Sequence, residues 1–344
     1  NEASTSQSNN TASLNDKLDP TVTGASLASD NSTIAVTISE AVYNTNGGSG
    51  ALEAADFSFS ISGGAASLSS ATPSSISASG NVYTLGVGLS GTPNGSETIT
   101  VNPVDNGIYD AAGNEASTSQ SNNTASLNDK LAPTVTNLTI GSNNSSVYIT
   151  FSEAVYSTNG ASGSLESSDF AFTINGGVAT LASNQPTEIS SSGNVYTLGL
   201  SLSGTPNGSE TLTVNVVDNG IYDSVGNEAS TSQSNNTVSL NDRLAPIISG
   251  IIISSDNATI SVTFSETVYK TNGGSGALEV SDFNLSINEG TASLSSSSPN
   301  NLSSNGNVYT LGLSLSGTPN GSEVLTVTPI DNGIYDAVGN EAST

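Results

Sequence analysis

The sequence contains no cysteine, histidine, methionine or tryptophan. Without cysteine and histidine, zinc, copper, iron–sulfur and haem sites lose their usual ligands, and Cys–His and Ser–His–Asp catalysis are excluded. Disulfides are excluded for the same reason. No apolar run approaches the roughly 20 residues of a membrane-spanning helix. We therefore expect neither a membrane span in this segment nor an enzyme.

Basic residues are also scarce, since four Lys and Arg stand against 30 Asp and Glu and the net charge is −26. Nucleic acids and anionic membranes both bind through basic side chains, so neither is an expected partner. Like charge at this density destabilises a fold unless something neutralises it, and hard divalent cations are the obvious candidates. The simpler alternative is that the acidic residues keep a long protein soluble.

One stretch recurs almost letter for letter, and its fullest copy runs from Val217 to Pro246. The equivalent positions Asn1, Asn114, Asn227 and Asn340 are 113 residues apart each time. The chain is therefore a tandem array of about three units, each long enough to bury a core of its own. An apolar content of 34% with 5% aromatics predicts thin cores and sheets with one solvent-facing side.

Within a unit, short segments rich in β-branched residues alternate with Gly-, Asn- and Ser-rich turns. In the second unit the pattern predicts strands over 133–140, 147–151, 170–174, 194–204 and 211–217, a helical turn over 165–170, weak strands within 176–193 and a polar last strand within 227–240. The segment 194–204 gives the clearest of these patterns. No segment has a sustained helical period.

About seven short strands in roughly 110 residues are typical of an immunoglobulin-like β-sandwich. The fold class we expect is therefore all-β, with tandem immunoglobulin-like β-sandwich domains arranged as an elongated rod. A parallel β-helix is the main competitor for a repeat rich in Ser, Asn and Gly. Its short, regular rungs are absent from this sequence.

The repeat predicts four segments: the last strand and linker of a preceding repeat at 1–19, and immunoglobulin-like repeats at 20–132, 133–245 and 246–344, the third without its last strand. Two explanations are open. Either a longer array is cut at this register, or residues 1–14 complete the third domain of a neighbouring molecule by strand addition. We favour the first.

Eight acidic positions recur in every unit, and several of them surround one pole of the predicted sandwich. The linker enters at that pole, the second strand ends there, and the loop before the last strand returns there. Four carboxylates from three separate stretches should converge. The three sets are Asp16, Glu40, Asp105 and Asp110; Asp129, Glu153, Asp218 and Asp223; and Asp242, Glu266, Asp331 and Asp336.

Such a set of carboxylates predicts bound Ca²⁺, which takes six to eight oxygen ligands from carboxylates, amides and backbone carbonyls. Further oxygens are offered by Asn128, Asn219 and Asn227. A second, weaker candidate site is the loop that carries Glu166 and Asp169, although Asp169 can instead cap a turn.

Two alternatives without calcium stay open. Lys130 or Arg243 in the linker can form an ion-paired hinge with the carboxylates, and the acidic side chains can simply be solvated loop residues.

Three short motifs resemble bacterial immunoglobulin-like domains of the S-layer-associated type. They are Ala132-Pro133-Thr134-Val135 at a strand start, Phe151-Ser152-Glu153 at a strand end, and Asp223-Ser224-Val225-Gly226-Asn227 before the last strand. The linker from Leu127 to Pro133 is similar to the calcium-binding linker of cadherins, without its full run of acids and its second Asn. The resemblance implies an extracellular, often calcium-stiffened extender of giant bacterial surface adhesins.

The function we expect is therefore structural: a stalk segment of a secreted or cell-surface bacterial adhesin or extracellular filament. Its partners would be neighbouring repeats of the same chain or, through strand addition, neighbouring copies, and its surface ligand is unknown. The alternative is a glycan- or ice-binding module that uses Thr- and Asn-rich faces and the recurring tyrosines Tyr156 and Tyr222. Paired carboxylates also occur in glycoside hydrolases, but repeated active sites along one array are not expected.

Overall fold

The computed structural model describes residues 9–344, and these are almost entirely strands, turns and loops. The only helical elements described are three single 3₁₀ turns: η1 (Ala54–Asp56), η2 (Ser167–Asp169) and η3 (Val280–Asp282). The chain divides into two compact units. Of the described residues, one unit comprises 9–133 with 155–163 and 221–229, and the other comprises the rest. Of the predicted segment 1–19, residues 1–8 lie outside the described residues.

The first unit contains a β-sandwich of nine strands. They are β1 (Val22–Leu27), β2 (Thr33–Ile38), β3 (Phe57–Ser62), β4 (Ser67–Leu68), β5 (Ile76–Ser79), β6 (Val82–Gly86), β7 (Leu89–Ser90), β8 (Thr98–Pro103) and β9 (Thr124–Ser126). One sheet has the order β1-β2-β6-β5, a second has β3-β8-β9, and β4 pairs with β7. When the strands are lettered in chain order and the short β4 and β7 are left out, the first two sheets are the A-B-E-D and C-F-G sheets of immunoglobulin domains.

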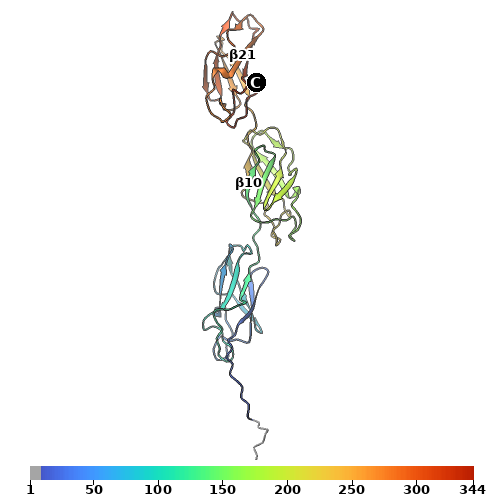
Figure 1. Ribbon diagram of the computed structural model, residues 1–344, viewed down its shortest axis with the longest axis vertical. Coiled ribbons are helices and arrows are strands. Elements are labelled where there is room, and N and C mark those ends of the chain that lie inside the picture. The colour runs from blue at the N-terminus through green and yellow to red at the C-terminus, as the bar shows by residue number, and fades with distance from the viewer. Residues whose placement is uncertain (1–8) are drawn as a thin grey trace, which may run out of the picture. The chain divides into compact units, whose positions relative to one another are not determined.

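The second unit repeats this order, and Figure 1 labels β10 and β21 within it. Residues 135–239 form β10 (Val135–Ile140), β11 (Ser146–Phe151), β12 (Phe170–Asn175), β13 (Thr180–Leu181), β14 (Ile189–Ser192), β15 (Val195–Gly199), β16 (Leu202–Ser203), β17 (Thr211–Val216) and β18 (Thr237–Ser239). Their sheets are β10-β11-β15-β14, β12-β17-β18 and β13-β16. This is the same sandwich again.

A further sandwich follows within the second unit. It is formed by β19 (Ile248–Ile253), β20 (Thr259–Phe264), β21 (Phe283–Asn288), β22 (Ser293–Leu294), β23 (Leu302–Asn305), β24 (Val308–Gly312), β25 (Leu315–Ser316) and β26 (Val324–Pro329). Its sheets are β19-β20-β24-β23, β21-β26 and β22-β25, so the described chain supplies no counterpart of β9 and β18 beside β26. The prediction of tandem immunoglobulin-like β-sandwiches is confirmed. The boundaries at residues 20, 133 and 246 stay predictions.

One predicted element is wrong in detail. The segment 194–204 forms two strands, β15 and β16, instead of one. The reason is that β15 pairs with β11 and β14, whereas β16 pairs with β13. Between them the Leu200 N–H donates to the Ser145 carbonyl at 2.9 Å, one pair beyond the last pair of the β11–β15 ladder.

Each core is built from alternate residues of the paired strands. In β11 the side chains of Val147, Ile149 and Phe151 are buried while those between them are partly or fully exposed. Phe151 packs edge-to-face on Tyr196 with ring centroids 5.8 Å apart, a favoured aromatic geometry. The period-2 pattern in the sequence therefore marks the core face directly.

A buried glutamate joins two turns of each of the first two sandwiches. In the second repeat Glu210 is fully buried, and its Oε1 accepts the N–H groups of Val178 at 2.8 Å and Ala179 at 2.9 Å. Gly177 has φ +60°, and a Cβ there would lie 2.1 Å from the Glu210 carboxyl carbon, so glycine is required. Burial acts to raise the pKa of Glu210, but the backbone N–H groups of Ala179 and Val178 outweigh it and lower the pKa.

Replacing this carboxylate should destabilise the second sandwich. Glu210→Ala leaves three backbone N–H groups, those of Val178, Ala179 and Asn207, without their acceptor. We expect a loss of roughly 3 kcal/mol in the free energy of unfolding, measured by chemical denaturation at pH 7. Glu188→Ala, which changes an exposed acid in the same repeat, serves as the control.

The pH dependence has a defined sign. A depressed folded-state pKa stabilises the fold above the unfolded value of about 4.3, and this stabilisation is lost as the pH falls through the folded pKa. The difference in stability between wild type and Glu210→Ala should therefore shrink in acid. A difference that stays constant down to about pH 2 would contradict this role of the carboxylate.

Candidate metal centre

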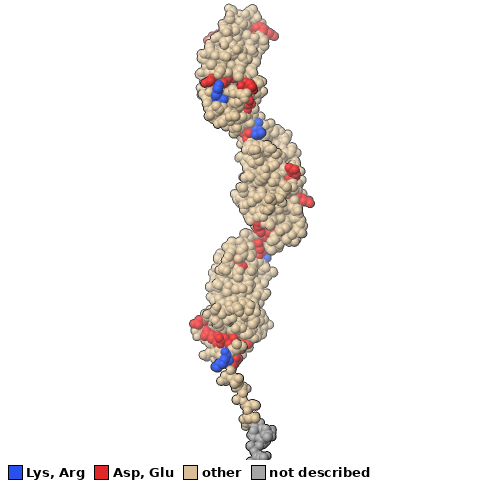
Figure 2. Space-filling model, in the orientation of Figure 1, with Lys and Arg blue, Asp and Glu red and all other residues tan. Residues whose placement is uncertain are grey.

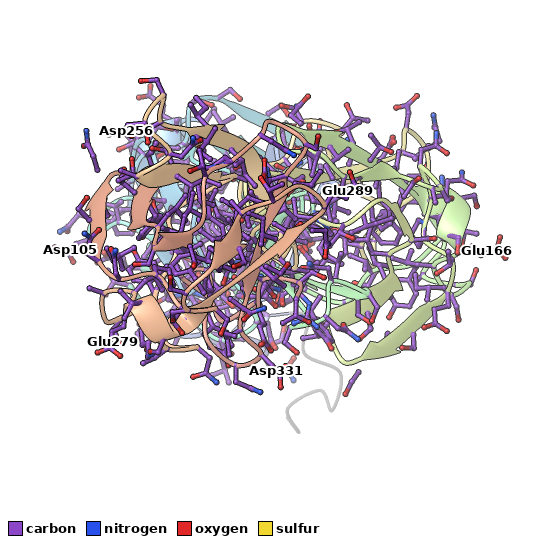
Figure 3. The ribbon with its side chains drawn as sticks, turned by 90° about the horizontal axis from the view of Figure 1, so that it is seen from above. Asp105, Glu166, Asp256, Glu279, Glu289 and Asp331 are labelled. Atoms are coloured by element: carbon purple, nitrogen blue, oxygen red, sulfur yellow. The ribbon has the colours of Figure 1, made fainter. Side chains whose placement is uncertain are left out.

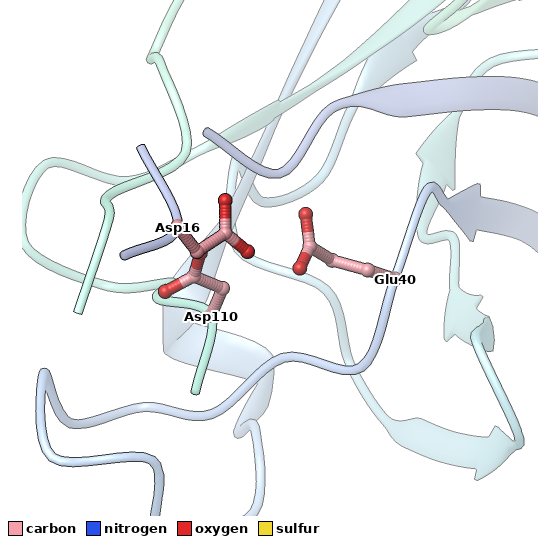
Figure 4. Close-up of side chains that lie close together, drawn as sticks. All are labelled: Asp16, Glu40 and Asp110. Atoms are coloured by element: carbon pink, nitrogen blue, oxygen red, sulfur yellow. The ribbon is translucent and has the colours of Figure 1, made fainter. Parts of the chain in front are cut away.

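Three carboxylates from separate segments meet in each of the groups formed by Asp16, Glu40 and Asp110 and by Asp242, Glu266 and Asp336. In each group one oxygen per residue lies within 4.8 Å of the others. Figure 4 shows the first group, in which the Glu40 side chain points toward Asp16 and Asp110. The equivalent residues of the remaining repeat are Asp129, Glu153 and Asp223. These nine residues are among the twelve that the repeat pattern selected.

The most buried member is held by its own loop. Asp336 is fully buried, and its Oδ1 accepts the N–H groups of Val338, Gly339 and Asn340 at 2.9, 2.7 and 2.8 Å. Its Oδ2 accepts one bond from the Asn340 side-chain amide at 2.6 Å. Gly339 has φ +98°, and a Cβ there would lie 2.5 Å from the Asn272 carbonyl oxygen. The Asp-x-x-Gly-Asn loop, which we call the cradle loop, thus fixes the carboxylate by hydrogen bonds. Oδ2 accepts only one of these bonds, so it can accept a further ligand.

The linker residue of the group is held differently. The Oδ1 atom of Asp242 accepts the N–H of Leu244 at 2.9 Å, so the carboxylate caps a short turn. On either side, the Asn241 N–H donates to Asn144 Oδ1 at 2.9 Å and the Arg243 N–H donates to the Pro206 carbonyl at 2.9 Å. The linker is therefore bonded to the sandwich that precedes it, while Asp242 meets Glu266 and Asp336 of the sandwich that follows.

The same contacts recur in the first unit, where Asn31 Nδ2 donates to the Asn128 carbonyl at 2.8 Å and the Asn128 N–H donates to Asn31 Oδ1 at 2.9 Å. Asn31 adopts φ 62° and is buried. Sequence reasoning did not single out this asparagine. The available signal was its recurrence as Asn144 and Asn257 in a turn, since asparagine tolerates the left-handed region better than most residues.

Charge repulsion acts inside these groups. Burial, followed by the nearby charges of Asp242 and Asp336, raises the pKa of Glu266. Burial, Asp110 and Asp16 raise the pKa of Glu40 in the same way. Among the described residues, neither Lys130 nor Arg243 forms an ion pair with the carboxylates of the groups around Glu40 and Glu266. These two groups therefore hold like charges together without a basic side chain paired to them.

The pKa of Asp110, the equivalent of Asp336 in the first unit, shifts in the opposite direction. Burial acts to raise the pKa of Asp110, but the Asn114 side chain and the N–H groups of Asn114, Ala112 and Gly113 outweigh it and lower the pKa. One member of the group is thus stabilised in its charged form, and the glutamate beside it is disfavoured in its charged form.

Three of the twelve predicted residues lie outside the groups: Asp105, Asp218 and Asp331. Each carboxylate accepts a bond from the side-chain amide of the asparagine that follows it, at 2.8 to 2.9 Å. Figure 3 shows Asp105 and Asp331 at the outside of the molecule. The Asp-Asn-Gly turn takes these side chains away from the pole, so three carboxylates meet where four were expected.

Two further predicted residues have hydrogen-bonding roles. The Oδ2 atom of Asp169 accepts the N–H of Glu166 at 2.8 Å, so Asp169 caps η2, as one of the two alternatives for this loop predicts. The amide nitrogen of Asn227 donates to Asp223 Oδ2 at 2.7 Å and so orients that carboxylate. That Asn227 offers an oxygen to a cation stays a prediction.

Charged side chains are unevenly spread over the surface. On the face drawn in Figure 2, acidic side chains gather in a few clusters, basic ones are rare, and most of the surface carries neither charge. No helix in the described residues is both long and apolar enough to span a membrane.

Comparison with known proteins gives distant likenesses only. No family model matches the chain, and no curated protein matches it. Among solved structures, the S-layer protein rSbsC is 16% identical, with a TM-score of 0.24, over 91% of this chain and 53% of that one. A three-domain fragment of titin, an E-to-A variant, is 11% identical, with a TM-score of 0.27, over 91% of this chain and 98% of that one. The chain spans about half the length of the S-layer structure. The fold assignment accordingly rests on the strand order.

Neutralising the glutamate of one group should have opposite effects with and without a divalent cation. Because the folded-state pKa of Glu266 is raised, its charge costs stability at neutral pH, and this cost disappears as the pH falls through the folded pKa. In excess chelator at pH 7, Glu266→Gln should therefore raise the melting temperature. In millimolar Ca²⁺ the same variant should lose part of any cation-dependent stabilisation.

Scanning calorimetry of both samples measures the two effects. The control is Glu289→Gln, which changes an exposed acid of the same repeat. A lowered melting temperature in chelator would show that the repulsion at Glu266 is already relieved by the protein.

Proposed function

We propose that the chain is a structural segment of a secreted or cell-surface protein, in which tandem sandwiches act as a spacer. Ca²⁺ bound at the recurring carboxylate groups stiffens the linkers between them. The observation that carries this proposal is the return of the same three-carboxylate group at a period of 113 residues. A spacer requires length and repeated junctions, and the near-identity of the repeats fits that requirement.

The ligand chemistry supports calcium. Two oxygens on opposite sides of a Ca²⁺ ion at about 2.4 Å are about 4.8 Å apart, so the spacing within each group suits joint coordination. The donors are carboxylates alone, and the chain has no thiol or imidazole, which favours a hard cation over zinc or copper. Backbone carbonyls and water would complete the six to eight ligands that Ca²⁺ takes.

The position of each group explains how binding would stiffen the chain. Asp242 belongs to a linker whose backbone is bonded to the preceding sandwich through Asn144 and Pro206. Glu266 and Asp336 belong to the following sandwich, one just after β20 and the other in the cradle loop. A cation that joins the three restrains the few residues between Asp242 and β19. We infer that this restraint holds successive domains in an extended array.

The finer assignment is to the stalk of a bacterial adhesin or an extracellular filament. It is supported by the strongly acidic composition, by the lack of cysteine and histidine, and by the repetition itself. Calcium is abundant outside cells, where sites with Kd values of about 10⁻⁴ to 10⁻³ M suffice.

The test is calorimetric titration of the whole chain with CaCl₂, for which we expect a stoichiometry of three, one ion for each group. With the cation at 100 times its Kd, each site should stabilise its repeat by about 2.7 kcal/mol. Asp242→Asn keeps the bond to Leu244 but removes a charge, and it should reduce the stoichiometry to two. Asp331→Asn, whose side chain lies outside the groups, is the matched control.

Small-angle X-ray scattering tests stiffening separately from binding. Addition of excess chelator should shorten or broaden the distribution of end-to-end distances. Heats of binding without any change in scattering would leave calcium as a stabiliser of single repeats and would contradict the stiffening. Absence of any heat up to about 10 mM, beyond the weakest extracellular sites, would contradict the calcium proposal itself.

A further inference from the structure

The strand β5 of the first sandwich is an open edge of its sheet. The sheet order β1-β2-β6-β5 places it last, and among the described residues it pairs with β6 alone. By contrast, the outer sides of β1 and β3 carry backbone bonds. The Val22 N–H in β1 donates to Gln120 Oε1 at 2.8 Å. The Phe59 N–H in β3 donates to the Ala71 carbonyl at 2.7 Å. An open edge offers its backbone groups to another strand.

The outward groups of β5 belong to alternate residues. The Gly86 N–H donates to the Ser75 carbonyl at 2.9 Å, so Ser75 faces β6. Neighbouring residues of a strand direct their backbone groups to opposite sides. The N–H and carbonyl groups of Ile76 and Ala78 therefore point away from β6. Because Ala78 is exposed and Ile76 is partly exposed, a further strand can reach these groups.

An apolar cavity of about 510 Å³ lies beside this edge. Its lining includes Ile76 and Ala78 of β5, Tyr83 of β6, and Val42 and Leu52 of the loop before η1. A strand that pairs with β5 would therefore cover apolar surface in addition to forming backbone hydrogen bonds.

Charged side chains are absent from this part of the chain. Although the protein carries 30 acidic residues, residues 57–96 contain no charged side chain, and β5 lies among them. In the second repeat the residue before β14 is Glu188, an exposed acid of the kind that protects sheet edges, and its equivalent in the first repeat is Ser75. Two copies with a net charge of −26 each repel one another, so they approach most easily where charge is lacking.

We propose that β5 binds β5 of a second copy of this chain as an antiparallel strand, with Ser77 of the two copies opposite each other. In this register Ile76 of each copy lies opposite Ala78 of the other, and the outward groups of both residues exchange their backbone hydrogen bonds. A large side chain thus meets a small one beside the cavity. Registers centred on Ile76 or on Ala78 place identical side chains opposite each other and leave the other residue without a strand partner.

The contact is isologous, because both copies use the same surface, so it closes as a twofold dimer. The equivalent edges are less suited to it. Glu188 precedes β14, and in β23 Ser304 replaces Ala78, so that a hydroxyl would pack against Leu302. The inference is independent of the proposed calcium sites, because no residue of β5 belongs to a carboxylate group. The experiments below are therefore done in excess chelator.

Cysteine trapping tests the register, and the native chain has no cysteine to interfere. Ser77→Cys places one thiol of each copy at the twofold axis, where opposite Cα atoms of a non-hydrogen-bonded pair are about 4.5 Å apart, within disulfide reach. Mild oxidation should give a disulfide-linked dimer. Ser79→Cys is the matched control, because the same residue of the second copy lies four positions along the strand, at about 13 Å. Equal crosslinking by both variants, or by neither, would overturn the proposal.

Sedimentation of the whole chain tests the affinity. One short strand per copy buries little surface, so we expect a reversible dimer with a Kd between about 10 µM and 1 mM. Ala78→Pro removes an outward N–H and leaves the bonds between β5 and β6 in place, since proline is tolerated where the N–H faces away from the ladder. The variant should weaken the dimer about 30-fold, as for one lost hydrogen bond in each copy.

A charge variant keeps the test independent of any effect of proline on folding. Ser75→Glu introduces the acid that the second repeat carries as Glu188, so the fold accommodates it. It should suppress the dimer at low salt and partly restore it at about 0.5 M salt, where the Debye length falls below about 8 Å. Ser60→Glu adds the same charge at an exposed position of β3, in the other sheet, and should leave the dimer unchanged. Monomers at every concentration, or a dimer that survives both Ala78→Pro and Ser75→Glu, would refute the pairing.

Discussion

The constraint on which most of the structure depends is that the final strand of each complete sandwich is also the start of the linker. Leu127 and Leu240 complete a core, and the asparagine that follows each of them bonds to a turn of the same sandwich. The next residue is the linker aspartate. Its carboxylate is therefore positioned by the packing of the preceding domain, so core closure, linker anchoring and the carboxylate group form one continuous set of contacts.

Electrostatics adds a second constraint. The cradle loop stabilises one buried carboxylate by backbone N–H groups, and the linker and the end of the second strand bring two more against it. In the groups around Glu40 and Glu266, no described basic side chain is ion-paired with these carboxylates. A protein with a net charge of −26 gains from a counter-ion at such points, because a cation would convert mutual repulsion into shared coordination.

The sequence allowed much of the fold to be predicted because the signals are local. Alternation in residues 147–151 marked a half-buried strand, and the turn residues separated the strands. The break between β15 and β16 could not be predicted, because apolar alternation continues through Leu200 while the chain changes its pairing partner. Periodicity reports which face is buried, and it carries no information about which strand lies alongside.

By itself the sequence determined the repeat, the all-β class and the set of recurring acids, since these depend on composition, spacing and period. Only the tertiary structure decided that Asp110 and Asp336 join a group while Asp105 and Asp331 turn outward. The physical reason is that the convergence of side chains depends on contacts between segments far apart in the chain, which composition, spacing and period do not report.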